Sequence, residues 1–137
     1  MQDLKDNTLI IMAENEIAAQ IVDAALTVHK ELGPGLFEST YEVCLVYELR
    51  SRGLEVEVQK TLPVLYKNVL LVDSAYRVDL LVNNKVIAEL KAVSELTDLH
   101  KQQLFTYIKL SKIKLGILIN FNVKLIKDGI KRVANKL

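Results

Sequence analysis

Residues 76–93 have the sequence Tyr76-Arg-Val-Asp-Leu-Leu-Val-Asn-Asn-Lys-Val-Ile-Ala-Glu-Leu-Lys-Ala-Val93, which predicts two β-strands joined by a tight turn at Asn83-Asn84. Side chains alternate between the two faces of a β-strand. Glu89 and Lys91 are therefore expected on one face of the second strand. The opposite face is expected to carry three small or apolar residues: Ala88, Leu90 and Ala92.

Three ionisable residues interrupt the apolar pattern of this hairpin, namely Asp79, Glu89 and Lys91. Asp79 is expected on the face opposite its apolar neighbours Val78, Leu80 and Val82. Charges inside apolar runs are costly unless they pair or bind a metal. Two carboxylates and a lysine can hold a divalent cation and a water. The alternative is an ion pair between Lys91 and one carboxylate in an ordinary sheet, and the hairpin alone leaves both interpretations open.

The composition predicts one soluble domain spanning residues 1–137, because half of the residues are apolar and 26% are charged. The longest apolar runs are far below the roughly 18 residues that a membrane span needs. No basic segment followed by an apolar one opens the chain, which argues against a signal peptide. Cys44 is the only cysteine, so no internal disulfide forms. These features predict a cytoplasmic protein with no membrane partner.

The charge is unevenly distributed, although its sum is only +1. Residues 1–50 carry three Lys or Arg against nine Asp or Glu, whereas residues 101–137 carry nine against one. A basic end of this kind can contact phosphates. It can equally be the solvated face of terminal elements, and it leaves open a dimer that shares one substrate.

Hydrophobic periodicity predicts three helices. The first runs from a cap at Asn15 to about residue 32, where Gly33-Pro34 ends it and His29 caps its last turn. The second runs from residue 36 or 37 to 52. The third begins after a cap at Ser94 or Thr97 and ends near residue 111.

Alternation with a period of two predicts the strands. Residues 56–66 form one strand that is disturbed at Pro63, residues 69–72 a further strand, and residues 114–121 a buried one. The basic end at 123–133 allows a last strand after a turn at Asp128-Gly129, and residues 9–12 suggest a short packed segment. The order of elements indicates an α/β domain with a mixed sheet that is flanked by helices.

The hairpin resembles the core of the PD-(D/E)XK nuclease superfamily, whose signature is an Asp followed at a distance by Glu-x-Lys. Here nine residues separate Asp79 from Glu89-Leu-Lys91. The segment Gly35-Leu-Phe-Glu38-Ser-Thr-Tyr41 is similar to the motif that names the GxxExxY family of that superfamily. Gln103-Leu-Phe-Thr-Tyr107 resembles the Gln-x-x-x-Tyr element of its helicase-associated exonuclease branch. Together these matches cover nearly the whole chain.

This resemblance implies a restriction-endonuclease-like core and a metal-dependent phosphodiesterase. Asp79 and Glu89 would bind Mg²⁺ or Mn²⁺, for which carboxylate oxygens are suitable hard ligands, and Lys91 would orient or deprotonate a water. Glu38 would be an outer ligand through water or would help to hold a second metal. Its alternative role is to stabilise a helix N-terminus. Gln103 and Tyr107 would contact a phosphate or position Lys91, although a tyrosine of this kind is often only part of the core.

Several function classes are disfavoured, because the chain has no Gly-rich phosphate loop, no Gly-x-Ser-x-Gly and no dinucleotide fingerprint. The first hypothesis is a nuclease, with DNA favoured over RNA as its substrate. The alternative is a catalytically inactive module on the same fold that binds nucleic acid or protein. A third hypothesis is a homo-oligomeric interaction protein. Aromatic residues that grip single strands are scarce, with no Trp and three Phe.

Overall fold

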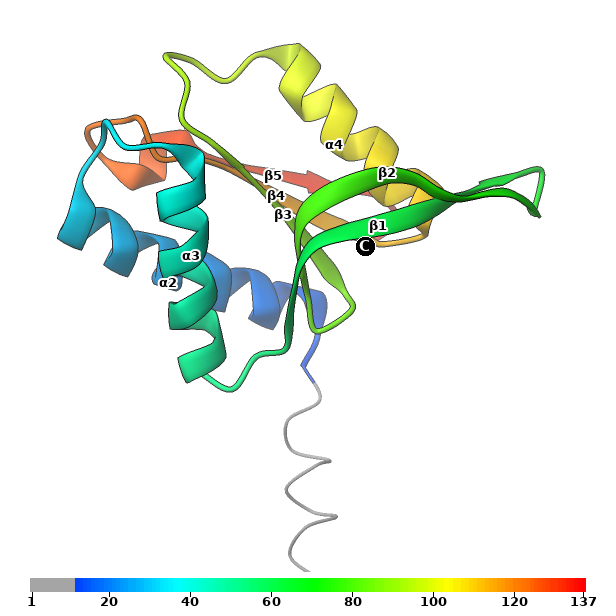
Figure 1. Cartoon of the computed structure of the whole chain (residues 1–137), viewed down its shortest axis with the longest axis horizontal. Coiled ribbons are helices and arrows are strands. Elements are labelled where there is room, and N and C mark those ends of the chain that lie inside the picture. Colours follow the sequence, from blue (N-terminus) through cyan, green and yellow to red (C-terminus); the bar gives the residue numbers. More distant parts are fainter. Residues whose placement is uncertain (1–11) are drawn as a thin grey trace, which may run out of the picture.

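The computed structural model describes residues 12–137, and Figure 1 shows how their elements are arranged. The helices are α2 (Glu14–Leu32), α3 (Glu38–Ser51), α4 (Asp98–Ser111) and a short 3₁₀ helix η1 (Ile126–Gly129). The strands are β1 (Val56–Tyr66), β2 (Val69–Val82), β3 (Val86–Lys91), β4 (Leu115–Asn120) and β5 (Ile130–Ala134). No helix within residues 12–137 is long and apolar enough to span a membrane. The packed segment predicted at 9–12 lies outside the described residues except for Met12.

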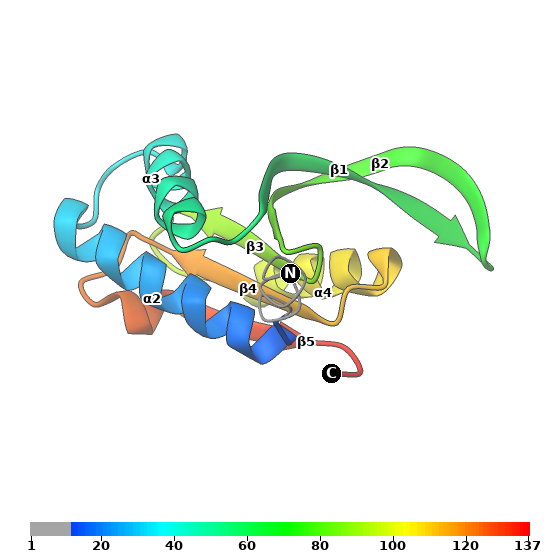
Figure 2. The same cartoon turned by 90° about the horizontal axis from the view of Figure 1, so that it is seen from below.

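The five strands form one sheet in the order in which they follow one another along the chain. Only β3 and β4 are parallel, and α4 lies in the crossover that such a pair requires. Helices α2 and α3 cover one face of the sheet, and α4 covers the other (Figure 2). This arrangement confirms the predicted α/β fold with a mixed sheet and helices on its faces.

Two hydrophobic clusters pack on opposite faces of the sheet, one beneath α2 and α3 and the other beneath α4. Ala88 and Leu90 of β3 pack with α2 and α3, as the alternation predicted. Ile87 packs on the side of α4, which contributes Leu104 and Ile108. The prediction for β2 was wrong at one residue, because Val78 packs on the α4 side whereas Leu80 and Val82 pack on the other. The alternation is interrupted at Asp79, which lies between them.

The boundaries of α2 correct two predictions. The helix begins at Glu14 after Ala13, so Asn15 lies in its first turn and is not the cap. Gly33 ends the helix with a φ of 70°, and its N–H donates to the carbonyl of His29 at 2.8 Å. The His29 ring does not cap this end, because its Nε2 lies 2.8 Å from the carbonyl oxygen of Val123 in the loop after β4. His29 thus ties α2 to that loop.

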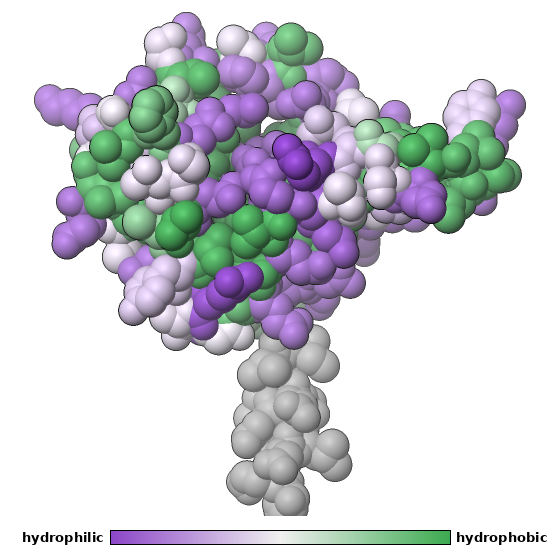
Figure 3. Space-filling view, viewed as in Figure 1, coloured by the Kyte–Doolittle hydropathy of each residue, from purple (hydrophilic) through white to green (hydrophobic). Residues whose placement is uncertain are grey.

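Strands β1 and β2 form a long hairpin that extends beyond the rest of the sheet (Figure 1). Its pairing shifts register next to Pro63, as predicted, and it turns at Lys67-Asn68, where both φ values are positive. The strand predicted at 69–72 is continuous with the one that contains Asp79, so the sheet has one strand fewer than expected. Apolar residues are exposed on the projecting end (Figure 3), namely Tyr66, Val69, Leu70, Leu71 and Val72.

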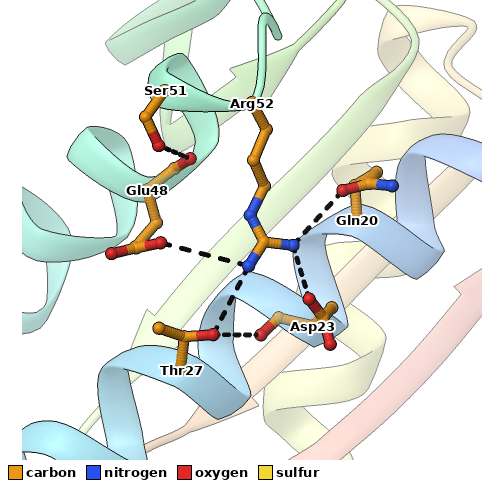
Figure 4. A network of polar contacts seen from close by, with 6 residues as sticks. All are labelled: Gln20, Asp23, Thr27, Glu48, Ser51 and Arg52. Carbon is orange, nitrogen blue, oxygen red and sulfur yellow. Dashed lines mark hydrogen bonds and ion pairs between the residues drawn. The ribbon is translucent and has the colours of Figure 1, made fainter.

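Arg52, directly after α3, joins that helix to α2 (Figure 4). Its Nη1 donates to Asp23 Oδ2 at 2.6 Å and to Gln20 Oε1 at 3.2 Å. Its Nη2 reaches Thr27 Oγ1 at 3.4 Å, and Glu48 Oε1 lies 4.0 Å away. The Arg52 side chain is only 22% exposed, whereas its partner Asp23 is 62% exposed, so solvent still screens this ion pair in part.

Replacing Arg52 with Ala should lower the free energy of unfolding by about 1 kcal/mol, because one guanidinium links several groups of α2 to α3. Urea denaturation would measure this loss. The matched control is Lys101→Ala, whose ion pair with Asp98 lies within α4 and is largely exposed. That change should cost less than about 0.5 kcal/mol. Equal effects of the two substitutions would contradict a role for Arg52 in joining the helices.

Candidate functional site

The candidate site lies at a fork in the sheet where β2 and β3 separate. The two strands pair over only three positions, from Val82 opposite Val86 to Leu80 opposite Ala88. Beyond this point β2 continues with β1, and β3 continues with β4. The backbone amides at the fork therefore need acceptors other than the neighbouring strand.

Two carboxylates supply these acceptors across the fork. The N–H of Asp79 donates to Glu89 Oε2 at 2.6 Å, and the N–H of Leu90 donates to Asp79 Oδ2 at 2.8 Å. Each strand thus contributes one carboxylate that binds the backbone of the other strand. This reciprocal arrangement brings together the two residues that the sequence singled out as metal ligands.

Lys91 lies beside this pair without forming the ion pair that was the alternative interpretation. Its positive charge acts on Glu89 and opposes the rise in the pKa of that carboxyl. No salt bridge to Lys91 occurs in the part of the chain that the structure describes. Its carbonyl accepts the N–H of Phe121 at 2.9 Å, which fixes the backbone of β3 at this position. The Lys91 charge is therefore close enough to act on Glu89, but among residues 12–137 it forms no ion pair with either carboxylate.

The Glu89 carboxyl is strongly perturbed, because it is only 8% exposed. Burial raises its pKa from 4.5 to about 7, and the negative charge of Asp79 contributes in the same direction. The hydrogen bond from the Asp79 backbone and the charge of Lys91 oppose this shift. A cation bound at the fork would favour the ionised form of Glu89.

Glu38 reaches the site from the first turn of α3. Its Oε2 accepts the N–H of Ala92, the residue after Lys91, at 3.3 Å. The start of α3 is held in place by Tyr41, which is fully buried and whose hydroxyl donates to the carbonyl of Gly33 at 2.6 Å. The same hydroxyl accepts the N–H of Leu36 at 3.1 Å. Tyr41 thus fixes the corner between α2 and α3, and with it the position of Glu38.

The sequence did not identify Gln59, which connects Asp79 to one further carboxylate, that of Glu42. Its Nε2 donates to Glu42 Oε2 at 2.6 Å and to Asp79 Oδ1 at 3.1 Å. Burial raises the pKa of Glu42, and the charges of Asp79 and Glu38 add to this effect. Gln59 occupies the left-handed region with a φ of 51°, a conformation that no local sequence signal indicated.

Helix α4 brings only one of its two predicted residues to the site. The Tyr107 ring stacks on Tyr76 with centroids 4.4 Å apart, and burial followed by the charges of Glu89 and Asp79 raises its pKa. Gln103 is exposed on α4, and its side chain makes no hydrogen bond to any residue in 12–137. Tyr107 therefore lies in the electrostatic field of the carboxylates, whereas within residues 12–137 no hydrogen bond connects the Gln103 side chain to them.

Asn120 is a second residue that the sequence analysis missed. Its side chain is 1% exposed at the end of β4, opposite Lys91 in the parallel register. Oδ1 accepts the N–H of Val93 at 3.0 Å, and Nδ2 donates to the carbonyl of Val93 at 2.9 Å. This clamp fixes the chain as it leaves β3. An asparagine in an otherwise apolar strand was the available signal, because buried amides need specific partners.

The donors at the fork suit a hard divalent cation in chemical type, since they are carboxylate oxygens in a site with excess negative charge. Among the described residues, no group of three or more His, Cys, Asp or Glu side chains is placed to hold a metal. The role of Glu38 as an outer ligand through water, or in holding a second metal, stays a prediction. One or two carboxylates completed by water are the usual protein ligands of Mg²⁺, so the pair fits this ion.

The raised pKa of Glu89 predicts how stability depends on pH when metal is removed with EDTA. Between pH 4.5 and about 7 the folded chain binds more protons than the unfolded chain, so its stability should fall as the pH rises. Glu89→Gln retains an acceptor for the Asp79 amide but cannot ionise. At pH 8 this variant should be more stable than the wild type by about 1–3 kcal/mol. Parallel pH profiles of the two proteins in urea denaturation would contradict the prediction.

The comparisons with known proteins agree with this geometry. A family model described as the PD-(D/E)XK nuclease superfamily matches residues 15–133, which include both carboxylates and Lys91. No curated protein and no solved structure gave a match. The mixed five-stranded sheet flanked by helices is consistent with the restriction-endonuclease-like fold of that superfamily. Because this family model matches well over half of the chain, the chain belongs to the PD-(D/E)XK nuclease superfamily.

Proposed function

We propose that the chain is a divalent-metal-dependent nuclease that hydrolyses phosphodiester bonds in nucleic acid, and that its residues form one such domain of the GxxExxY family. Nucleases of the superfamily generally use divalent metals, and a nuclease acts on nucleic acid. The observation that carries the proposal is the convergence of Asp79 and Glu89 at the fork, with the unpaired Lys91 ammonium beside them. We further propose Mg²⁺ or Mn²⁺ as the ion.

The two carboxylates would hold the ion and the lysine would act on the nucleophile. When bound, the ion lowers the pKa of a coordinated water and neutralises charge on the phosphate. Glu89 must lose its proton to act as a ligand, which Lys91 assists through its positive charge. Lys91 would then orient the attacking water or stabilise the negative charge that develops on phosphorus-bound oxygens. Gln59 would keep Asp79 in position through its amide.

The surrounding residues would have supporting roles. Glu38 would act through water at the outer side of the site, since its carboxylate already binds the Ala92 amide. Tyr107 would donate its hydroxyl proton to a phosphate oxygen, which its raised pKa keeps available. Gln103 would need to meet the substrate from the exposed face of α4. The basic residues after position 100 would contribute to binding of the phosphate backbone, with DNA as the first substrate to test.

A second candidate function is a module that binds nucleic acid or protein without turnover. The observation that favours this alternative is that Asp79 and Glu89 already accept hydrogen bonds from the backbone amides of the fork, a role that needs no metal. It predicts salt-sensitive binding of nucleic acid without cleavage, or no binding of nucleic acid at all if the partner is a protein.

The decisive experiment is cleavage of single- and double-stranded DNA and RNA with Mg²⁺ or Mn²⁺, compared with EDTA. We expect metal-dependent cleavage by the wild type and none by Asp79→Ala. Lys91→Ala should lower the rate by about 10²–10⁴-fold, as loss of a group that acts in the transition state does. The control is Lys67→Ala, because Lys67 is exposed at the turn between β1 and β2, on the projecting end of the hairpin. Unchanged turnover of Lys91→Ala would remove its assigned role.

Metal binding can be tested separately from turnover. At pH 8, where Glu89 is largely ionised, titration calorimetry should show that Glu89→Gln binds Mg²⁺ or Mn²⁺ at least about tenfold more weakly than the wild type. Glu57→Gln is the matched control, since Glu57 is an exposed residue of β1 that pairs with Lys60. Wild-type affinity in Glu89→Gln would count against Glu89 as a ligand.

A further inference from the structure

Phe37 is the most exposed large apolar residue at the entrance to the site. It is 83% exposed and immediately precedes Glu38, at the N-cap of α3. Its side chain makes no capping hydrogen bond, although Ser, Thr, Asp or Asn at this position would stabilise the helix. Phe37 thus leaves α3 without a side-chain cap and exposes an aromatic ring to water. Neither feature contributes to the stability of the fold.

The ring lines a hollow of about 460 Å³ between the start of α3 and the chain that leaves β3. The hollow is lined by Gly35, Leu36, Phe37, Glu38, Ala92 and Asn122. Its volume lies within the range of about 300–1,000 Å³ that is typical of ligand sites. Both walls are fixed, because Tyr41 binds the backbone of Leu36 on one side, and Asn120 Oδ1 accepts the N–H of Asn122 on the other.

The hollow adjoins the proposed catalytic centre. Glu38 belongs to both, and Ala92 directly follows Lys91. A phosphate held at the fork would therefore place the adjoining nucleotide beside the hollow. A base within a duplex is stacked between its neighbours and cannot offer its face to a protein ring, whereas an unpaired base can.

We propose that this hollow binds one unpaired nucleobase next to the scissile phosphate, with the Phe37 ring stacked on its face. The inference rests on the proposed nuclease function and extends it to substrates with single-stranded or frayed nucleotides. Asn122 is exposed on the opposite side; its Nδ2 donates one hydrogen bond to the carbonyl of Val93 at 3.4 Å, which leaves its second N–H and Oδ1 for the edge of the base. One aromatic face combined with one amide suits a nucleobase better than a purely apolar partner.

The chain contains no tryptophan, so Phe37→Trp would introduce a single fluorescent reporter at the hollow. In EDTA, a single-stranded oligonucleotide of DNA or RNA should quench this fluorescence as its base stacks on the indole. A blunt duplex of the same sequence should not. The matched control is Tyr47→Trp, because Tyr47 is 71% exposed on the same helix and lines a different hollow. Its fluorescence should not respond to the single strand.

Phe37→Ala tests the energetic contribution of the ring, and the exposed position leaves the fold intact. Fluorescence anisotropy with a labelled single strand should show about 5- to 100-fold weaker binding than the wild type, as loss of one aromatic–base stack does. Duplex binding should be unchanged. If Phe37→Ala binds the single strand with wild-type affinity, or if Phe37→Trp binds it without quenching, the nucleobase site is overturned while the proposed nuclease stands. If the wild type binds and cleaves no nucleic acid, both proposals fail together.

Discussion

The structure depends on how two backbone amides are satisfied where the central hairpin opens. The amides of Asp79 and Leu90 lose the regular partners of a strand ladder, and an unpaired part-buried N–H is unfavourable. Carboxylates from the opposite strands accept both hydrogen bonds. The same requirement buries the Glu89 carboxyl, which raises its pKa, and the nearby charge of Asp79 adds to this rise. The same carboxylate oxygens of Asp79 and Glu89 therefore satisfy the backbone amides and create a negative charge that favours a cation.

The sequence predicted those parts of the fold that depend on local patterns. Helical periodicity located α2, α3 and α4 to within about two residues, and Thr97 caps α4 as expected. The alternation of side chains along β3 correctly placed Ala88 and Leu90 on the face that packs against α2 and α3, and Glu89 on the other face. The spacing of Asp79 and Glu89 was sufficient to identify the carboxylate pair, because a hairpin with a short turn places such positions side by side.

What the sequence did not indicate depends on contacts between distant segments. Gln59 adopts a positive φ in the middle of β1, which no propensity predicts, and there it binds both Glu42 and Asp79. The break expected before residue 76 is a register shift and not the end of a strand, because the pairing passes from Leu62 opposite Tyr76 to Val64 opposite Val72 while β2 continues. The sequence around Lys91 was equally compatible with an ion pair and with an ammonium group that has no carboxylate partner. Only the three-dimensional structure distinguishes these two interpretations.

The order of the strands has a consequence for how the chain folds. The hydrogen bonds between the two strands of the fork join residues 10 and 11 positions apart, whereas Glu38 and Ala92 are 54 apart. Closing a short loop loses less conformational entropy than closing a long one, so the hairpin can form before the helices dock. In that open intermediate water would still screen the two carboxylates. Their repulsion would grow only as the helices and β4 exclude solvent, which makes the final docking step the one most sensitive to pH.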